Sequence, residues 1–205
     1  EHDLAYIAME FLKGKDLVPY TKAGNLMPLA KAMVELHGGS LRVYLAHAKS
    51  EHVVGQAVAA LLAREERLGL KDMTTYASFG ERVKRLKRQL VTLLARLKDE
   101  GHTICGYGAP GKGNTLLNYC GIGPDFLDFT VDRNPYKHGR YTPGMQIPIR
   151  PVEAIDAARP DFLLILPWNL KSEIMQQMRH IGKWGGKFII PIPEPTIVAP
   201  EEIAS

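Results

Sequence analysis

One stretch of this chain has the pattern of a buried strand, a glycine-rich turn and a helix. The apolar run Thr103–Tyr107 leads into Gly106-x-Gly108-x-x-Gly111, and residues 111–120 continue with helical spacing. This is the dinucleotide fingerprint of a Rossmann unit, whose glycines permit a tight turn, close approach of backbone to a diphosphate, and close helix–strand packing. The turn therefore predicts a parallel α/β sheet with a helix N-terminus that is suited to anions.

The segments after this turn continue to alternate between strands and helices. Residues 134–151, with four prolines and two glycines, are expected to form a long loop, and the chain ends in a Pro-rich tail. The predicted strands are 103–107, 126–131, 162–166 and 187–192, and the predicted helices are 111–120, 152–158 and 170–181. This order predicts an α/β fold with a doubly wound, mostly parallel sheet, in a Rossmann-like domain over residues 78–205.

The chain before residue 78 is organised differently. A short helix is predicted at 3–13, and residues 32–48 hold two apolar runs joined by two glycines, which indicates a strand hairpin. Apolar residues at Val53–Arg67 recur at helical spacing, so residues 51–77 are expected to form a helix followed by a hinge. This part is therefore expected to be a separate piece.

A long amphipathic helix is expected to begin the second domain. Ser78 is the predicted N-cap, and Glu81 stands three residues later, as in a capping box. An apolar stripe runs from Phe79 to Leu97, and Gly101 is expected to end the helix. The stripe is expected to pack on a sheet.

The charge and cysteine content argue against several classes of protein. Lys and Arg total 26 against 22 Asp and Glu, and the basic residues concentrate in 82–98, among apolar residues at helical spacing. That pattern favours a solvated helix face over nucleic-acid binding. Cys105 and Cys120 form no CxxC pair, which argues against a zinc site or a disulfide framework, and Cys105 is expected to pack as a reduced thiol. No metal site is therefore predicted.

The chain has no apolar segment of the length that a membrane span needs. Its first residues lack the basic and apolar regions of a secretory signal. We therefore expect no membrane partner, and a reducing cytoplasm is the expected compartment.

The glycine-rich turn is the candidate binding site. An anion would lie on the free N–H groups and the positive end of the helix that follows, with Lys112 as counter-charge. Asp132 stands 24 residues after Gly108, near the usual place of the acidic residue that holds a ribose hydroxyl. Arg133 and Arg140 flank the next loop as candidate diphosphate clamps. The predicted binding residues are Gly106, Gly108, Ala109, Gly111, Lys112, Gly113, Asn114, Asp132, Arg133 and Arg140.

Other interpretations of these residues remain open. The run Gly106-x4-Gly111-Lys112 also fits a P-loop, but Gly113 stands where Ser or Thr would ligate Mg²⁺. The glycines could serve packing alone, Asp132 could cap the turn that follows it, and the two arginines could be ordinary surface residues.

Four longer motifs resemble the C-terminal domain of bacterial sugar C-methyltransferases. They are GYGAPGKGNTLLNYCGI, VDRNPYKHGRYTPGMQIPI, LILPWNLKSEI and FIIPIPEP, and they stand in order within residues 78–197. The resemblance implies an enzyme that methylates a carbon of a nucleotide-linked 4-keto-deoxysugar with S-adenosylmethionine. This family usually has Ala at the position of Gly111, so the third fingerprint glycine is not a requirement there, which weakens the NAD interpretation.

The resemblance extends to the first part of the chain. HGGSLRVY at 37–44 resembles the end of the family's central domain, so residues 1–50 are expected to be the tail of a class I methyltransferase domain. It implies that Glu1 and His2 belong to a catalytic Tyr-His-Glu-His motif, with His2 as base or substrate-positioning group and Glu1 as its partner. The alternative is that both are polar residues without a role at a chain end.

The same resemblance implies that the rest of the parent protein lies upstream. S-adenosylmethionine would be bound by an upstream methyltransferase domain, which a zinc-binding domain precedes, so this chain alone is expected to be inactive and to bind no cofactor. It would be a C-terminal fragment of a sugar C-methyltransferase that contributes to binding a nucleoside-diphosphate sugar. The alternatives are an NAD(P)-binding oxidoreductase-like domain and a non-catalytic structural or interaction domain.

Overall fold

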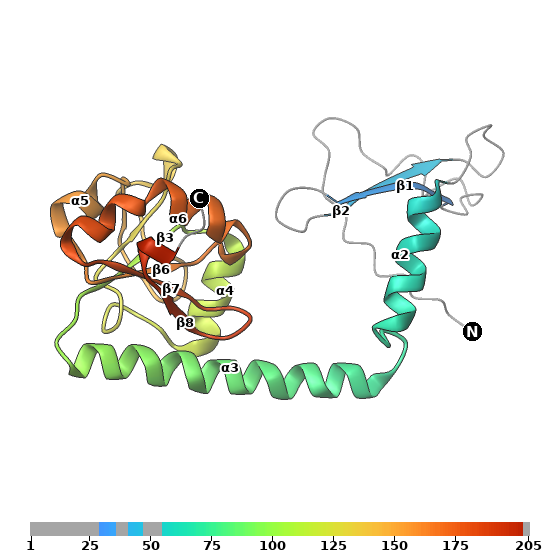
Figure 1. Cartoon of the computed structure of the whole chain (residues 1–205), viewed down its shortest axis with the longest axis horizontal. Coiled ribbons are helices and arrows are strands. Elements are labelled where there is room, and N and C mark those ends of the chain that lie inside the picture. Colours follow the sequence, from blue (N-terminus) through green and yellow to red (C-terminus); the bar gives the residue numbers. More distant parts are fainter. Residues whose placement is uncertain (1–28, 36–40, 47–54, 203–205) are drawn as a thin grey trace. The chain divides into compact units, whose positions relative to one another are not determined.

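The computed structural model describes residues 29–35, 41–46 and 55–202. The chain divides into two compact units, Glu1–Ala77 and Ser78–Ser205 (Figure 1). None of the helices in the described ranges is long and apolar enough to cross a membrane.

The described part of the first unit contains a strand pair, a helix and the start of the long helix that follows. Strand β1 (Leu29–Glu35) pairs antiparallel with β2 (Leu41–Ala46), which confirms the strand hairpin that the sequence predicts. Helix α2 (Gln56–Arg67) follows within the range of the predicted helix. The helix predicted at 3–13 lies outside the described residues.

The long helix α3 (Met73–Asp99) begins earlier than predicted. The side chain of Asp72 accepts a hydrogen bond of 2.9 Å from the backbone N–H of Thr74, which satisfies a free amide at the helix start. The capping box at Ser78 and Glu81 is therefore wrong, because both residues lie inside the helix. Asp is as good an N-cap residue as Ser, and the helix begins after the earlier of these two residues.

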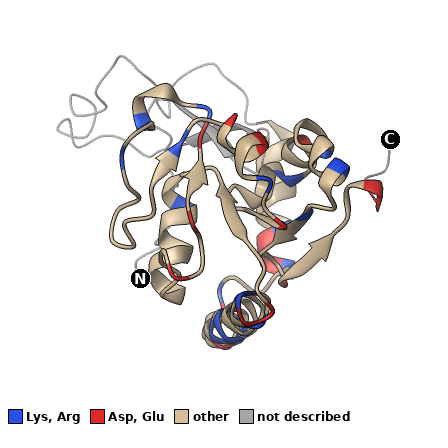
Figure 2. Ribbon diagram, turned by 90° about the vertical axis from the view of Figure 1, so that its left-hand side faces the viewer, with Lys and Arg blue, Asp and Glu red and all other residues tan. Residues whose placement is uncertain are grey.

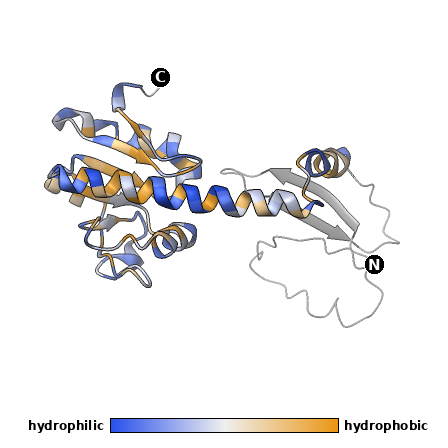
Figure 3. Cartoon of the chain, turned by 90° about the horizontal axis from the view of Figure 1, so that it is seen from below, coloured by the Kyte–Doolittle hydropathy of each residue, from blue (hydrophilic) through white to orange (hydrophobic). Residues whose placement is uncertain are grey.

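The later part of the apolar stripe of α3 packs on the sheet of the second unit, as predicted, whereas Phe79 at its start is 56% exposed. Leu90, Leu94 and Leu97 are buried in the core beside the strands, and burial of each contributes about 1.5–3 kcal/mol. Charged residues of both signs mark α3 in Figure 2, and hydrophilic residues follow its outer face in Figure 3. Gly101, with a φ of 86°, ends the helix, and its N–H donates to the carbonyl of Lys98.

The second unit is built on a six-stranded sheet with the order β5-β4-β3-β6-β7-β8. Figure 1 labels β3, β6, β7 and β8 of this sheet. Neighbouring strands are parallel, except that β8 runs antiparallel to β7. The strands are β3 (Ile104–Tyr107), β4 (Thr130–Val131), β5 (Ile149–Arg150), β6 (Phe162–Ile165), β7 (Lys187–Ile190) and β8 (Thr196–Val198). The mostly parallel α/β sheet of Rossmann-like type is thereby confirmed.

Three short strands differ from the sequence prediction. β4 has only the last two residues of the predicted strand 126–131, and two other strands were not predicted. β5 lies inside the predicted loop 134–151, and β8 lies inside the predicted Pro-rich tail. β5 has only two residues, and prolines at 148 and 151 flank it, so no alternation of apolar residues marks it. Both are edge strands, where nearby proline is tolerated.

Helices cover both faces of this sheet. Phe162 and Leu164 of β6 belong to a core cluster with α3 and α4, whereas Leu163 and Ile165 belong to a second cluster with α5 and α6. The sheet is therefore doubly wound, as predicted. These helices are α4 (Gly111–Cys120), α5 (Ala154–Ala158) and α6 (Lys171–Gln177), and short 3-10 turns lie at Pro135–Lys137, Trp168–Leu170, Arg179–Trp184 and Pro200–Glu202.

Both cysteines are free thiols inside this core. Cys105 lies in β3 in the cluster with α5 and α6, and burial raises its pKa to about 12. Cys120 ends α4 and lies in the cluster on the other face. Cys105 therefore packs as a buried, protonated thiol, as the sequence predicts.

Candidate functional site at the carboxyl edge of the sheet

The strand order creates a switch point at the carboxyl edge of the sheet. The chain leaves β3 for β4 and β5 on one side and then returns to β6 on the other side of β3. In open α/β sheets, ligands bind in the crevice outside the carboxyl ends of the strands at such a point. The glycine turn after β3 and the turn after β6 flank this point, so both are parts of the candidate site.

Lys112 connects these two turns. It lies in the first turn of α4, and its ammonium group donates a hydrogen bond to the side-chain oxygen of Asn169. The same ammonium group lies 5.2 Å from the ring centroid of Trp168. Partial burial lowers the pKa of Lys112. The predicted cation therefore lies at the switch point, held by one polar and one aromatic side chain from the turn after β6.

The positions of the glycines in the turn require glycine for different structural reasons, and one of them does not require it. Gly108 has a φ of 86°, and a Cβ atom there would lie 2.7 Å from Cγ of Pro167. A Cβ atom at Gly113 would lie 2.9 Å from Cβ of Leu166, whereas one at Gly111 would meet nothing within 4 Å. The close helix–strand packing expected of the third fingerprint glycine is therefore provided by Gly113, and Gly111 leaves open space beside the first turn of α4.

Asp132 is tied to the glycine turn from the end of β4. One carboxylate oxygen accepts a hydrogen bond of 2.8 Å from the N–H of Ala109, and the other accepts one of 2.9 Å from the N–H of Asn134. Burial opposes ionisation of this carboxyl group, but hydrogen bonds from Lys137, Asn134 and Ala109 lower its pKa below the usual value. Asp132 therefore caps the turn that follows it and also fixes the glycine turn.

Lys137 completes the contacts on this side of the turn. Its ammonium group lies 2.8 Å from the carboxylate of Asp132 and donates to the carbonyl of Ala109 at 3.1 Å. The ring nitrogen Nε2 of His138 lies 2.7 Å from the backbone oxygen of Asp132. The 3-10 turn after β4 therefore contacts the glycine turn through the side chain of Lys137.

The two predicted arginines have different surroundings. Arg133 is exposed, and its guanidinium group lies 3.5 Å from the carboxylate of Glu173 in α6. Arg140 is also exposed, and its backbone N–H donates to the carbonyl of Lys137 while its carbonyl accepts from Ile149 in β5. The structure therefore gives Arg133 a partner on α6 and places Arg140 beside the edge strand.

The remaining predicted residues lie on either side of the turn. Gly106 packs against Thr130 of β4, since a Cβ atom there would lie 2.7 Å from the hydroxyl oxygen. Asn114 donates its backbone N–H to the carbonyl of Pro110, and its side-chain oxygen is buried with no hydrogen-bond partner among the described residues. Glu1 and His2 lie outside the described residues, so their catalytic roles stay a prediction.

Sequence reasoning missed Trp168, Asn169 and Lys137. The first two come soon after the apolar strand Phe162–Ile165, and the carboxyl ends of parallel strands are the usual place for ligand contacts. Lys137 stands five residues after Asp132, in a segment that was predicted only as a loop. The position of Trp168 and Asn169 just after β6 could therefore have indicated them as site residues. Nothing in the sequence indicated how the loop after β4 folds, so Lys137 could not be found in this way.

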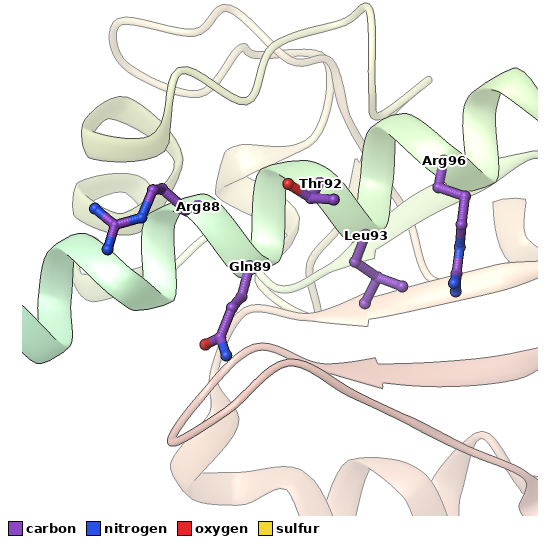
Figure 4. A pocket seen from close by; sticks show the side chains of 5 residues that line it. All are labelled: Arg88, Gln89, Thr92, Leu93 and Arg96. Atoms are coloured by element: carbon purple, nitrogen blue, oxygen red, sulfur yellow. The ribbon is translucent and has the colours of Figure 1, made fainter.

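A pocket elsewhere in the second unit lies along α3. Its lining residues are Arg88, Gln89, Thr92, Leu93 and Arg96, and none of the residues predicted for nucleotide binding is among them (Figure 4). Among the described residues, no group of three or more His, Cys, Asp and Glu side chains could hold a metal ion.

Comparisons with known proteins place the chain in a family. A model of the C-methyltransferase C-terminal domain matches residues 35–193. The C-methyltransferase NovU of Streptomyces niveus is 39% identical over 167 residues, which are 82% of this chain and 40% of that protein. The match therefore spans about two fifths of the relative's length.

Among solved structures, UDP-D-quinovosamine 4-dehydrogenase from Vibrio fischeri is similar with a TM-score of 0.37 and 16% identity. The similarity covers 51% of this chain and 98% of that one, and at this level it carries no argument about function. The family match covers more than half of the chain, and the matched residues include the glycine turn, β4 and β6. The chain therefore belongs to the C-methyltransferase C-terminal domain family.

Proposed function

We propose that this chain is the C-terminal part of an S-adenosylmethionine-dependent sugar C-methyltransferase and that it helps to bind a nucleoside-diphosphate sugar. Its family and the name of its relative support methyl transfer to carbon. The nucleotide-sugar role rests on the site itself. The first turn of α4 lies open at the switch point with a cation beside it.

The donors at this point suit a diphosphate. The first-turn N–H groups of an α-helix have no acceptor within the helix, and the helix dipole adds positive potential there. Gly111 leaves space for a ligand to approach, and the ammonium group of Lys112 is near by. The side-chain amide of Asn169 adds a further polar group. Backbone amides at a helix start, together with one lysine, commonly bind phosphate groups in proteins.

The same geometry argues against a dinucleotide. An NAD-type site needs its acidic residue free to hold a ribose hydroxyl. Both carboxylate oxygens of Asp132 accept hydrogen bonds inside the protein, from Ala109, Asn134 and Lys137. The carboxylate that completes the fingerprint in the sequence therefore serves the turn itself.

C-methylation beside a ketone explains why such a domain is useful. A base must remove the acidic proton, the enolate must be stabilised, and the carbanion must face the methyl group that S-adenosylmethionine supplies when bound to the upstream domain. A histidine with a pKa near neutrality suits the proton transfer, and His2 with Glu1 is our candidate pair for the parent protein. A domain that fixes the diphosphate would hold the sugar in place, and such positioning lowers the barrier.

Isothermal titration calorimetry tests the proposal with dTDP, UDP, NAD, NADP and S-adenosylmethionine. We expect saturable binding of at least one nucleoside diphosphate and none of S-adenosylmethionine, whose site would lie upstream. Binding of NADP without a nucleoside diphosphate would support the oxidoreductase-like alternative. Absence of all binding would support a structural domain.

Lys112→Ala tests the placement of the ligand. We expect it to weaken binding of the diphosphate by about 1–3 kcal/mol, because a charge-assisted contact is lost. The matched control is Lys187→Ala, at the amino end of β7 on the opposite edge of the sheet, which should leave the affinity unchanged. Equal affinities of the wild type and Lys112→Ala would remove Lys112 from the site.

A further inference from the structure

The side of the glycine turn that faces β4 carries an ion pair in contact with the turn. Oδ2 of Asp132 lies 2.8 Å from the N–H of Ala109 and 2.8 Å from Nζ of Lys137. Nζ of Lys137 also lies 3.1 Å from the carbonyl oxygen of Ala109. One residue of the turn is therefore held on both its N–H and its carbonyl by a pair of opposite charges.

The carboxylate alone would oppose a negatively charged ligand. Asp132 is 9% exposed and keeps its charge, because its hydrogen bonds lower its pKa. Charges in such a sheltered position interact more strongly than in water. The first amide of α4, at Gly111, is two residues from Ala109, which is bonded to this carboxylate. A diphosphate on the amides of α4 would therefore be repelled by Asp132 unless its charge is neutralised.

Lys137 is placed to do this and has capacity left for a ligand. An ammonium group carries three N–H donors, and the structure gives Nζ two acceptors, on Asp132 and Ala109. Its side chain is 36% exposed, so the group is accessible from solvent. With Lys112 on the β6 side of the turn, two ammonium groups and one carboxylate leave a net positive charge around it.

We propose that Lys137 is the second cation of the nucleotide site, which neutralises Asp132 so that the glycine turn accepts a diphosphate. The inference rests on the proposed function, and it adds a residue and an electrostatic role to that site. Lys137 acts mainly through Asp132 and the turn, and it is therefore a positioning residue in the parent enzyme.

The test is a set of variants of this chain, titrated with dTDP and UDP by calorimetry. Lys137→Met keeps most of the side chain's length and removes the charge. We expect it to weaken binding by about 10- to 100-fold, as for the loss of a contact to a charged group. Lys137→Arg should retain most of the affinity, because its charge can still reach the carboxylate.

A double variant separates charge from loop geometry. Asp132→Asn removes the negative charge but leaves one acceptor oxygen where the carboxylate has two, so one of the bonds from Ala109 and Asn134 is lost. Asp132→Asn combined with Lys137→Met should nevertheless recover part of the affinity lost in Lys137→Met. A purely structural role of Lys137 predicts no recovery, because its bond to the carbonyl of Ala109 is absent from both variants.

The outcomes distinguish this inference from the proposed function. If the wild type binds neither diphosphate, the proposed function fails, and this inference fails with it. If the wild type binds and Lys137→Met binds equally well, or if the double variant shows no recovery, the inference alone is overturned. Should Lys137→Met not fold, as judged by circular dichroism, Lys137→Gln replaces it, because its amide can still donate to the carbonyl of Ala109 without carrying the charge. Binding of Lys137→Gln equal to that of the wild type would contradict the inference.

Discussion

At the scale of single residues, the polar groups of the glycine turn divide into two sets. The N–H of Ala109 and the carboxylate of Asp132 bond to each other, so they fix the turn. The first turn of α4, with Lys112 directed to Asn169, faces the switch point between β3 and β6. The fingerprint therefore describes how the turn is built more than which nucleotide it holds.

Gly111 and Gly113, which are two positions apart in the sequence, provide a prediction at this scale. Gly113→Ala should destabilise the fold by about 1–3 kcal/mol, because the new Cβ atom would lie 2.9 Å from Cβ of Leu166 inside a packed core. Gly111→Ala is the matched control, since a Cβ atom there meets nothing within 4 Å. It should stabilise the helix by up to about 1 kcal/mol.

Urea denaturation followed by circular dichroism measures both variants. The assignment of close packing to Gly113 predicts opposite signs for the two changes in the free energy of unfolding. Equal effects, or a larger loss in Gly111→Ala, would return the packing role to the third fingerprint glycine.

At the scale of elements, the apolar face of α3 is exposed near its start and buried against the sheet in its later turns. Phe79 and Leu90 lie eleven residues apart, which is about three turns, so they share a face of the helix. Leu90 is fully buried against the sheet, whereas Phe79 is 56% exposed. The later turns of α3 therefore supply its packing energy within the second unit.

This difference predicts unequal effects of two truncations. Leu90→Ala should destabilise the second unit by about 2–5 kcal/mol, because it leaves a cavity in the core. Phe79→Ala should change the free energy of unfolding by no more than about 0.5 kcal/mol, as for other surface substitutions. Thermal unfolding measures both, and a Phe79→Ala loss comparable to that of Leu90→Ala would contradict the packing described here.

The sequence predicted the long, periodic elements well and the short ones poorly. The later part of the α3 stripe, the strands β3, β6 and β7, and the doubly wound arrangement follow from apolar spacing, which core packing enforces. β5 and β8 are short edge strands near prolines, where no periodicity develops. The start of α3 was misplaced because Asp72 and Ser78 are both good caps.

The candidate site was predictable in its position and less so in its contacts. A strand, a glycine turn and a helix locate it on the carboxyl edge of the sheet, and Lys112 lies there as expected. The partners of Asp132 depend on how the loop after β4 folds back, which brings Lys137 to Ala109. Contacts between segments that are far apart in sequence have no local pattern, so they required the structure.

At the scale of the whole molecule, the chain joins two compact units, and the second carries the candidate site. Its family match and its relative support a part in methyl transfer to carbon. The match covers 40% of the relative, so this chain spans about two fifths of that protein's length. Under the proposed function, the second unit binds the nucleotide part of the sugar substrate and fixes its position.

The most direct measurement is a titration of isotope-labelled chain with dTDP and UDP, followed through the NMR signals of its amides. The proposal predicts that a nucleoside diphosphate shifts the backbone signals of Gly111 and Lys112 and the side-chain amide of Asn169. The signals of Arg88 and Arg96, in the pocket along α3, should stay in place. Shifts confined to that pocket, or no shifts at the first turn of α4 at saturating ligand, would contradict a nucleotide site at the switch point.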